Sequence, residues 1–406
     1  MSTKTKKPRI VSNVERHGGG LDLQALRSLA QNHPTEFVRR TGDLIDAGEF
    51  AWSDVRDLKA FYNAFCDVQV DVDVRLHGRV RTVTSSAFPV LSGNLTVAGI
   101  NAAYEAVPTI GDLLVRDFDS AKETATIVGL LAEVQSNLER KEGEPYTLVG
   151  AGEERFDILS NPKGLRMQIT QEMIERNDVE NAIARINYLG EVPREEIEEQ
   201  TLRRVTDHDG SAASGAEPYV LHIGKTASAL FSATANTPGT RAPSGTRLTN
   251  NALVDTTDLD AARTRLVTML NSRGKRIAMP VSSMTLLVPD ALEATAQTIL
   301  NSTQTPGVFG EQNPWGPQGS RRPRLLSSPK LDDLSTGAWY LGSFEKQFLR
   351  KWAFRMEMVT MSGDLATYLR SRIAFEARVA WDCEIGATDY VYVVQNLSGT
   401  TAPKDD

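Results

Sequence analysis

The first part of the chain changes from a helical to a strand-like spacing of apolar residues. Leucines and aromatic residues recur at near-helical intervals between Leu21 and Phe65, which predicts amphipathic helices with a new start at Pro34. Ser53 is in a position to cap the last of these helices. The valines from Val68 to Val74 then alternate with polar residues, so this stretch is expected to form a half-exposed strand.

The next two segments contain too few large apolar residues for cores of their own. Residues 83–115 are small, apolar and little charged, and we expect them to run along a neighbouring surface. Residues 143–170 predict three strands, separated by turns at Gly150–Gly152 and Asn161–Gly164. The large apolar side chains of the first two strands are Tyr146, Leu148, Phe156 and Ile158. A two-stranded hairpin is marginal in water, so this one should need another surface to lie on.

A long helix is expected from about Asn177 to Val205, because isoleucines, leucines and valines supply an apolar side along this stretch. Asn177 or Asp178 can cap its beginning. Pro193 lacks an amide hydrogen and crowds the preceding turn, so we expect a kink or a restart there. The glutamates between Glu195 and Glu199 are most simply interpreted as a solvated face.

The second half of the chain mixes helices and strands. A helix is expected around Asp258, and Pro289 is expected to open another that runs through Leu300. The proline- and glycine-rich residues 304–323 predict a long loop. Strands are expected at Thr285–Val288, Ala338–Leu341, Ile373–Trp381 and Tyr390–Val394.

Composition places the chain among globular proteins and excludes several classes. Its 406 residues are 40% hydrophobic and 24% charged, enough apolar material for a sizeable core. The net charge of -7 disfavours a strongly basic nucleic-acid-binding protein. Two cysteines, Cys66 and Cys383, exclude a disulfide scaffold. The longest apolar run, Thr126–Ala132, is too short for a membrane span. The basic start lacks the apolar segment of a secretory signal, so we expect the protein to stay in the cytoplasm.

No group of residues stands out as a catalytic constellation. Gly224-Lys225-Thr226 is similar to the end of a phosphate-binding loop, but Tyr219 occupies the position that requires a glycine. His17 precedes three glycines, as in an esterase oxyanion loop, yet the chain has no G-x-S-x-G elbow. The five histidines show no zinc-binding spacing. We therefore expect no enzyme, no cofactor and no metal site, and the extended segments without cores indicate self-assembly.

Four stretches, in this order, resemble the major capsid proteins of tailed phages, especially the Mu-like prophage head subunit. In the first, Glu142–Gly190, a hairpin and a strand lead into the long helix through the entry residues Ile169, Ile174, Asn177 and Asp178. The other three are Leu230–Asn236, Leu286–Ala296 and Trp339–Leu341. The resemblance covers roughly residues 83–396 and leaves the beginning of the chain unmatched.

The resemblance implies an α+β fold of the Hong Kong 97-like capsid class. That fold has an N-terminal arm, an extended β-hairpin (the E-loop), a P domain with a long spine helix, and an A domain. The implied division is an N-terminal helical extension (1–82), the N-arm region (83–142), the E-loop hairpin (143–172), the P-domain spine helix (173–223), the A domain (224–351), and P-domain strands with a C-terminal tail (352–406).

The resemblance also implies the function of a major head protein, which assembles in the host cytoplasm into the icosahedral shell around the double-stranded DNA of a tailed phage. The expected partner is the chain itself, in hexamers and pentamers. Scaffold, portal, maturation protease and cement proteins are further candidates, DNA would be held non-specifically, and no membrane is involved. The self-assembly contacts are expected at Tyr146, Leu148, Arg155, Phe156, Ile158 and Trp315.

Three questions stay open at this point. The same fold could form an encapsulin-like compartment around enzyme cargo. A hydrolase or nucleotide-dependent enzyme using His222–Thr226 is a further alternative. The extension, residues 1–82, could be a built-in scaffold that a phage protease removes, or it could remain as an arm. Its first residues carry Lys4, Lys6, Lys7 and Arg9, which suit a solvated tail or a weak electrostatic arm.

Overall fold

The computed structural model describes residues 23–66, 69–76, 79–122, 124–133, 150–207, 220–223, 226–233, 241–271, 274–277, 279–280, 283–305, 311–362 and 372–399. The chain divides into two compact units. Unit 1 comprises residues 1–108, 163–195 and 356–381, and unit 2 comprises residues 109–162, 196–355 and 382–406. Within the described ranges, no helix is both long enough and apolar enough to cross a membrane.

Unit 1 begins with three amphipathic helices, as the apolar spacing predicts. They are α1 (Leu23–Asn32), α2 (Pro34–Asp46) and α3 (Leu58–Cys66). Pro34 occupies the start of α2, where its missing amide hydrogen costs nothing. The predicted cap at Ser53 is wrong, because Ser53 lies in a short 3-10 turn, Trp52–Asp54. Asp57 provides the interaction instead, accepting a hydrogen bond from the amide of Ala60.

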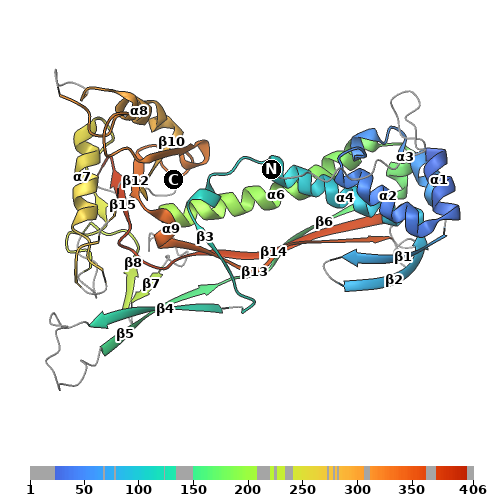
Figure 1. The fold of residues 1–406 in the computed structure, drawn as a ribbon, viewed down its shortest axis with the longest axis horizontal. Coiled ribbons are helices and arrows are strands. Elements are labelled where there is room, and N and C mark those ends of the chain that lie inside the picture. The colour runs from blue at the N-terminus through green and yellow to red at the C-terminus, as the bar shows by residue number, and fades with distance from the viewer. Residues whose placement is uncertain are drawn as a thin grey trace, which may run out of the picture. The chain divides into compact units, whose positions relative to one another are not determined.

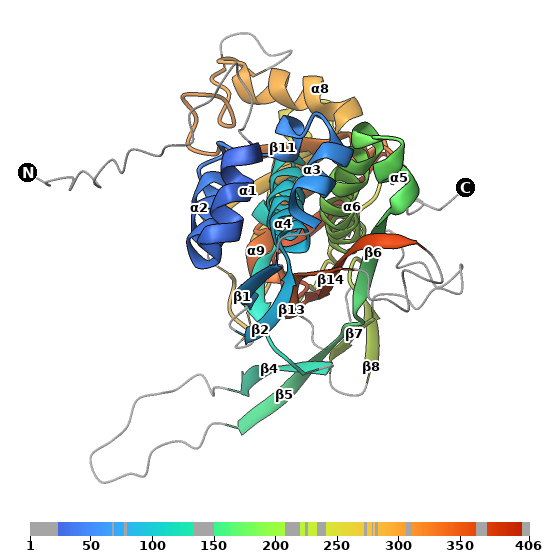
Figure 2. The ribbon, with the colours of Figure 1, turned by 90° about the vertical axis from the view of Figure 1, so that its right-hand side faces the viewer.

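The predicted valine-rich strand is confirmed as β1 (Gln69–Leu76), and it pairs antiparallel with β2 (Arg79–Ser86). Strand β2 leads directly into α4 (Ala87–Ala106). The expectation of an extended, coreless arm over residues 83–115 is wrong for this part of the chain. Within α4 the side chains of Phe88, Leu91 and Leu95 are buried, and α1, α2 and α3 gather beside this helix (Figures 1 and 2).

The predicted long helix is confirmed as α6 (Val179–Thr206), which follows the short helix α5 (Gln171–Glu175). Pro193 lies inside α6 and does not divide it, so the predicted restart is wrong. Arg194 places its guanidinium over the Tyr104 ring of α4, 4.9 Å from the ring centroid. The side chains of Ile186 and Leu189 are buried on the apolar side of α6.

Strands β3 (Arg116–Asp119), β13 (Phe348–Ser362), β14 (Ile373–Ala387) and β6 (Lys163–Thr170) form a sheet in that order. The alternation predicted for residues 373–381 is confirmed, because its five apolar side chains are all buried. Strand β6, also predicted, pairs antiparallel with this part of β14. Strand β13 was not predicted from the sequence.

A mixed sheet in the order β11-β10-β12-β15-β9 forms the centre of unit 2. Its strands are β9 (Arg247–Leu248), β10 (Thr285–Pro289), β11 (Arg324–Ser328), β12 (Ala338–Gly342) and β15 (Val393–Leu397). Helices α7 (Thr256–Val267) and α8 (Asp290–Asn301) pack on it (Figure 1). The predictions for β10, α8 and β12 are confirmed. Asp255 caps α7 together with Asp258, and the buried core of the unit surrounds Trp339 and Leu287.

The extended hairpin of unit 2 differs from the predicted one. Strand β5 (Gly150–Leu159) pairs antiparallel with β4 (Thr124–Glu133), not with the residues just before it. The predicted turn at Gly150–Gly152 is therefore wrong, because these residues pair with Leu131–Glu133 inside the ladder. A smaller hairpin, β7 (Val220–Ile223) with β8 (Thr226–Ala229), lies next to β5.

Candidate assembly site

The β4–β5 hairpin of unit 2 carries Arg155, Phe156 and Ile158, three of the six residues predicted to make contacts between subunits. Its ladder is ten residue pairs long and runs from the pair Thr124–Leu159 to the pair Glu133–Gly150. Phe156 pairs with Ile127, and Ile158 pairs with Ala125. Because directly opposed residues of an antiparallel pair share a face, these four positions form one apolar row, whose end at Ile158 is already buried within the single chain. An isolated two-stranded hairpin of this length gains stability when such a row is covered.

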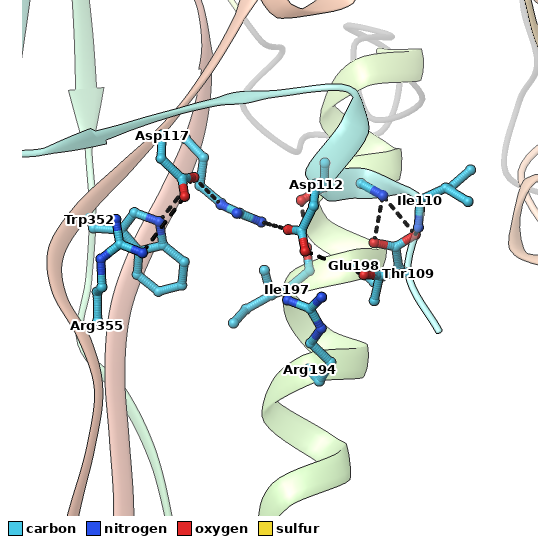
Figure 3. A network of polar contacts seen from close by, with 12 residues as sticks. Thr109, Ile110, Asp112, Asp117, Arg194, Ile197, Glu198, Trp352 and Arg355 are labelled. Carbon is cyan, nitrogen blue, oxygen red and sulfur yellow. Dashed lines mark hydrogen bonds and ion pairs between the residues drawn. The ribbon is translucent and has the colours of Figure 1, made fainter. Parts of the chain in front are cut away.

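The chain leading into the hairpin is fastened to α6 by a buried carboxylate. Glu198, 4% exposed, accepts hydrogen bonds from the amide of Ile110 at 2.9 Å and from the amide of Gly111 at 2.9 and 3.1 Å (Figure 3). Gly111 lets the carboxylate approach this closely, because a Cβ atom there would lie 2.5 Å from the Glu198 Oε2 atom and the carboxylate would have to shift. Burial raises the pKa of Glu198 above its ordinary value of 4.5, and the two amide donors only partly oppose this rise.

A second fastening joins the same segment to β13. The buried guanidinium of Arg350 donates from Nε to Asp117 at 2.8 Å and from Nη1 to Asp112 at 2.7 Å. The indole of Trp352 also donates to Asp117, at 3.1 Å, and Arg355 lies beside the same carboxylate (Figure 3). Burial lowers the pKa of Arg350, but the hydrogen bonds and charges of the two aspartates outweigh this effect and raise the pKa above its ordinary value.

The chain leaving the hairpin is fastened to the next residue of β13. Lys351 is fully buried, and its Nζ atom donates to the hydroxyl of Ser160, 2.9 Å away. A lysine is almost never buried in this way unless polar partners receive it. Ser160 follows β5 directly, whereas Asp117 precedes β4. Arg350 and Lys351, which are adjacent in β13, therefore bind the two stems of the hairpin, that is, the segment that enters β4 and the segment that leaves β5. The sequence places Arg350, Lys351 and Trp352 on a strand face or at a subunit contact, but it did not indicate that Arg350 and Lys351 hold the hairpin.

The six predicted contact residues differ in their location and burial. Arg155 and Phe156 lie in β5 as expected of hairpin residues, and Tyr146 and Leu148 lie outside the described residues. Ile158 is only 3% exposed within a single chain. Trp315 is wrong as a surface contact, because its side chain is fully buried in the core of unit 2. Asn313 joins this loop to α8 by donating to the carbonyl oxygen of Ile299 at 2.6 Å, and it accepts from the amide of Trp315 at 2.9 Å.

The part of the chain that the structure describes offers no alternative chemistry. Gly224 and Lys225 lie outside the described residues, and the described elements on either side of them are the strands β7 and β8. A phosphate-binding loop instead joins a strand to a helix. Among the described residues, no cluster of three or more histidine, cysteine or acidic side chains could hold a metal ion. Cys383 is buried and Cys66 is half-buried, and neither of these two described residues forms a disulfide.

Comparisons with known proteins point to shells. A family model described as phage capsid protein matches residues 160–396, more than half of the chain. No curated protein matches the chain. A solved capsid of a native GTA particle is 9% identical, covers 81% of this chain and 96% of its own, and gives a TM-score of 0.44. The capsid of cyanophage P-SCSP1u is 13% identical, with coverage of 73% and 89% and a TM-score of 0.45. A virus-like particle from Pyrococcus furiosus is 7% identical, with coverage of 74% and 95% and a TM-score of 0.38.

The predicted α+β class is confirmed by the described helices and strands. The family match confirms the prediction of a structural capsid protein rather than an enzyme. The long helix and the extended hairpin are the elements of that fold on which the sequence argument depended. The chain belongs to the phage capsid protein family and is a shell-forming component of the virion.

Proposed function

We propose that this chain is the major head subunit of a tailed phage, and that the β4–β5 hairpin is the flap by which each subunit holds the next one in the shell. The observation that carries the proposed role of the hairpin is that β13 binds both of its stems, through Arg350 to Asp117 and through Lys351 to Ser160. The apolar residues Ile127 and Phe156, which pair across the ladder, are the proposed contacts with a sister subunit. The order of the four stretches quoted above favours a Mu-like head subunit.

In this proposal, unit 2 supplies the A domain and the hairpin, and α6 is the spine helix. Hexamers and pentamers are the expected assemblies, and their many weak contacts add up once the shell closes. Scaffold, portal, maturation protease and cement proteins are the expected further partners. The net charge of -7 suits non-specific enclosure of double-stranded DNA rather than tight binding to it.

Shortening the hairpin tests this role. Residues 126–157 are replaced by Asn-Gly, which joins the directly paired Ala125 and Ile158 through a two-residue turn and leaves both stems in place. The subunit should stay folded by circular dichroism and fail to form shells in electron micrographs. Phe156→Ser should weaken assembly, and Thr126→Ser, on the alternate row, is the matched control. Normal shells from the shortened chain would contradict the role of the hairpin.

The content of the particles tests the rest of the proposal. Shells purified from phage-producing cells should contain nuclease-protected double-stranded DNA. Shells that contain an enzyme and no DNA would support the encapsulin-like alternative instead.

A further inference from the structure

Helix α4 of unit 1 is apolar on all sides. Glu105 is its only charged residue, and a helix of this kind is stable in water only when it is covered all round. Helix α6 covers one side at very short range. A Cβ atom on Gly190 would lie 2.4 Å from the carbonyl oxygen of Ile100, and a Cβ atom on Gly99 would lie 2.9 Å from Ile186. Both glycines thus permit close approach of the two helices.

The N-terminal extension covers another side of α4 with aromatic rings. Phe88 of α4 contacts Phe61 and Tyr62 of α3, with ring centroids 5.7 and 4.8 Å apart. Phe61 continues the cluster to Phe65 at 5.5 Å and to Trp52 at 6.0 Å. Apart from Tyr62, these rings are buried. The cluster therefore forms a hydrophobic core that needs both the extension and the body of unit 1.

Two hydrogen bonds add directional links between the extension and this body. The indole Nε1 of Trp52 donates to the hydroxyl of Thr96 on α4 at 3.3 Å, and both side chains are buried. The amide of Leu58, which opens α3, donates to the Asn177 side chain at 2.6 Å. Asn177 has a φ of 56°, the left-handed conformation that asparagine tolerates better than most residues. The turn before α6 is thus tied to the first turn of α3.

From these contacts we infer that residues 23–86 stay in the mature shell as a permanent cover for α4 and are not a scaffold that is removed. The family match begins only at residue 160, so the inference goes beyond the proposed function. A cut after residue 86 followed by loss of the fragment would expose Phe88, Leu91 and Leu95 together. A scaffold protein cannot occupy that face of α4 either, because the extension already covers it.

The mass of the subunit in mature, DNA-filled particles tests the inference directly. The measured mass should include residues 23–86, and a subunit that begins beyond residue 86 would overturn the inference. Recombinant truncations give a second test. Deletion of residues 2–22 should preserve the yield of soluble subunit, whereas deletion of residues 2–86 should abolish it. Equal soluble yields from the two truncations would also overturn the inference.

A third measurement does not depend on folding of a truncated chain. A protease site inserted between residues 77 and 78 allows the folded full-length chain to be cut between β1 and β2. The fragment ending there should remain bound through size-exclusion chromatography, since its aromatic cluster stays in place. Release of the fragment with no change in the remaining protein would refute the inference. If neither the full-length chain nor any of these variants forms shells, the result would count against the proposed function and not against this inference.

Discussion

Replacing Arg350 should loosen the entrance to the hairpin selectively. Arg350→Met keeps most of the aliphatic length of the side chain and removes the guanidinium that bonds Asp112 and Asp117. Bonds of this type, to charged partners, contribute about 1.5–3 kcal/mol each. The carboxylate side chains are 37% and 35% exposed, so water can partly replace the lost donor. We therefore expect the free energy of local opening to decrease by about 3 kcal/mol when both bonds are lost, which is the low end of the summed range.

Hydrogen exchange measures this loss where it occurs. Local opening governs the exchange of amides in the segment before the hairpin, such as those of Leu113, Leu114 and Ser120, which are bonded within the fold. A loss of about 3 kcal/mol corresponds to exchange that is roughly 100-fold faster, because each 1.4 kcal/mol is a factor of ten. The yield of shells in electron micrographs should fall as well, since the hairpin would leave unit 2 in a less defined direction.

Arg355→Met is the matched control, because Arg355 approaches the same Asp117 carboxylate from the same strand. Its side chain is 60% exposed, and its shortest ion pairs measure 3.8 Å to Asp117 and 3.3 Å to Asp119. Exposed pairs of this kind contribute about 0–1 kcal/mol, so exchange should rise less than about fivefold. Equal acceleration in the two variants would refute the assignment of Arg350 as the fastening point.

Substitutions at Glu198 and Gly190 test the packing around the hairpin and the long helix. Burial raises the pKa of Glu198, so its contribution to stability is complete below pH 4.5 and is lost as the pH rises through the raised pKa. Glu198→Gln should therefore have the melting temperature of the wild type at acidic pH and a higher one at neutral pH. Glu198→Ala should lose about 1–3 kcal/mol of stability at both pH values, because two amides lose their acceptor. A Gln variant that melts lower at neutral pH would contradict this. Gly190→Ala should destabilise by about 1–3 kcal/mol because its Cβ meets the Ile100 carbonyl, and Gly42→Ala in α2, with open space around it, should instead raise the melting temperature.

Local sequence patterns predicted those helices and strands that bury only one face against the rest of the fold. Strand β14 alternates because one face is buried, and α2 begins at a proline because the first turn needs no amide donor. Helix α4 was missed because it is covered on more than one side, which removes the polar stripe that reveals a surface helix. Its small residues, such as Gly99, allow close helix packing but look like an extended segment in the sequence.

The hairpin and Trp315 show a different limit, since their partners are distant in the sequence. The glycines at the start of β5 indicated a turn, and the true partner strand, β4, lies beyond residues 134–149. Residues 304–323 have the composition of an exposed loop, yet Asn313 and the core of unit 2 turn Trp315 inward. No local pattern encodes these choices, because the competing arrangements differ only in long-range contacts.

Attachment at two points changes what the hairpin can contribute to assembly. A flap held by one stem could swing, and each new contact with a sister subunit would have to offset the loss of that freedom. Arg350 and Lys351 instead hold the entering and leaving stems from adjacent positions of one strand, so the direction of β4 and β5 is set before a neighbour arrives. In the proposed role, a preorganised flap would need only a short apolar contact, such as one made by the paired residues Ile127 and Phe156, to select the correct neighbour. Weak contacts of this kind still permit a misplaced subunit to dissociate before the shell closes.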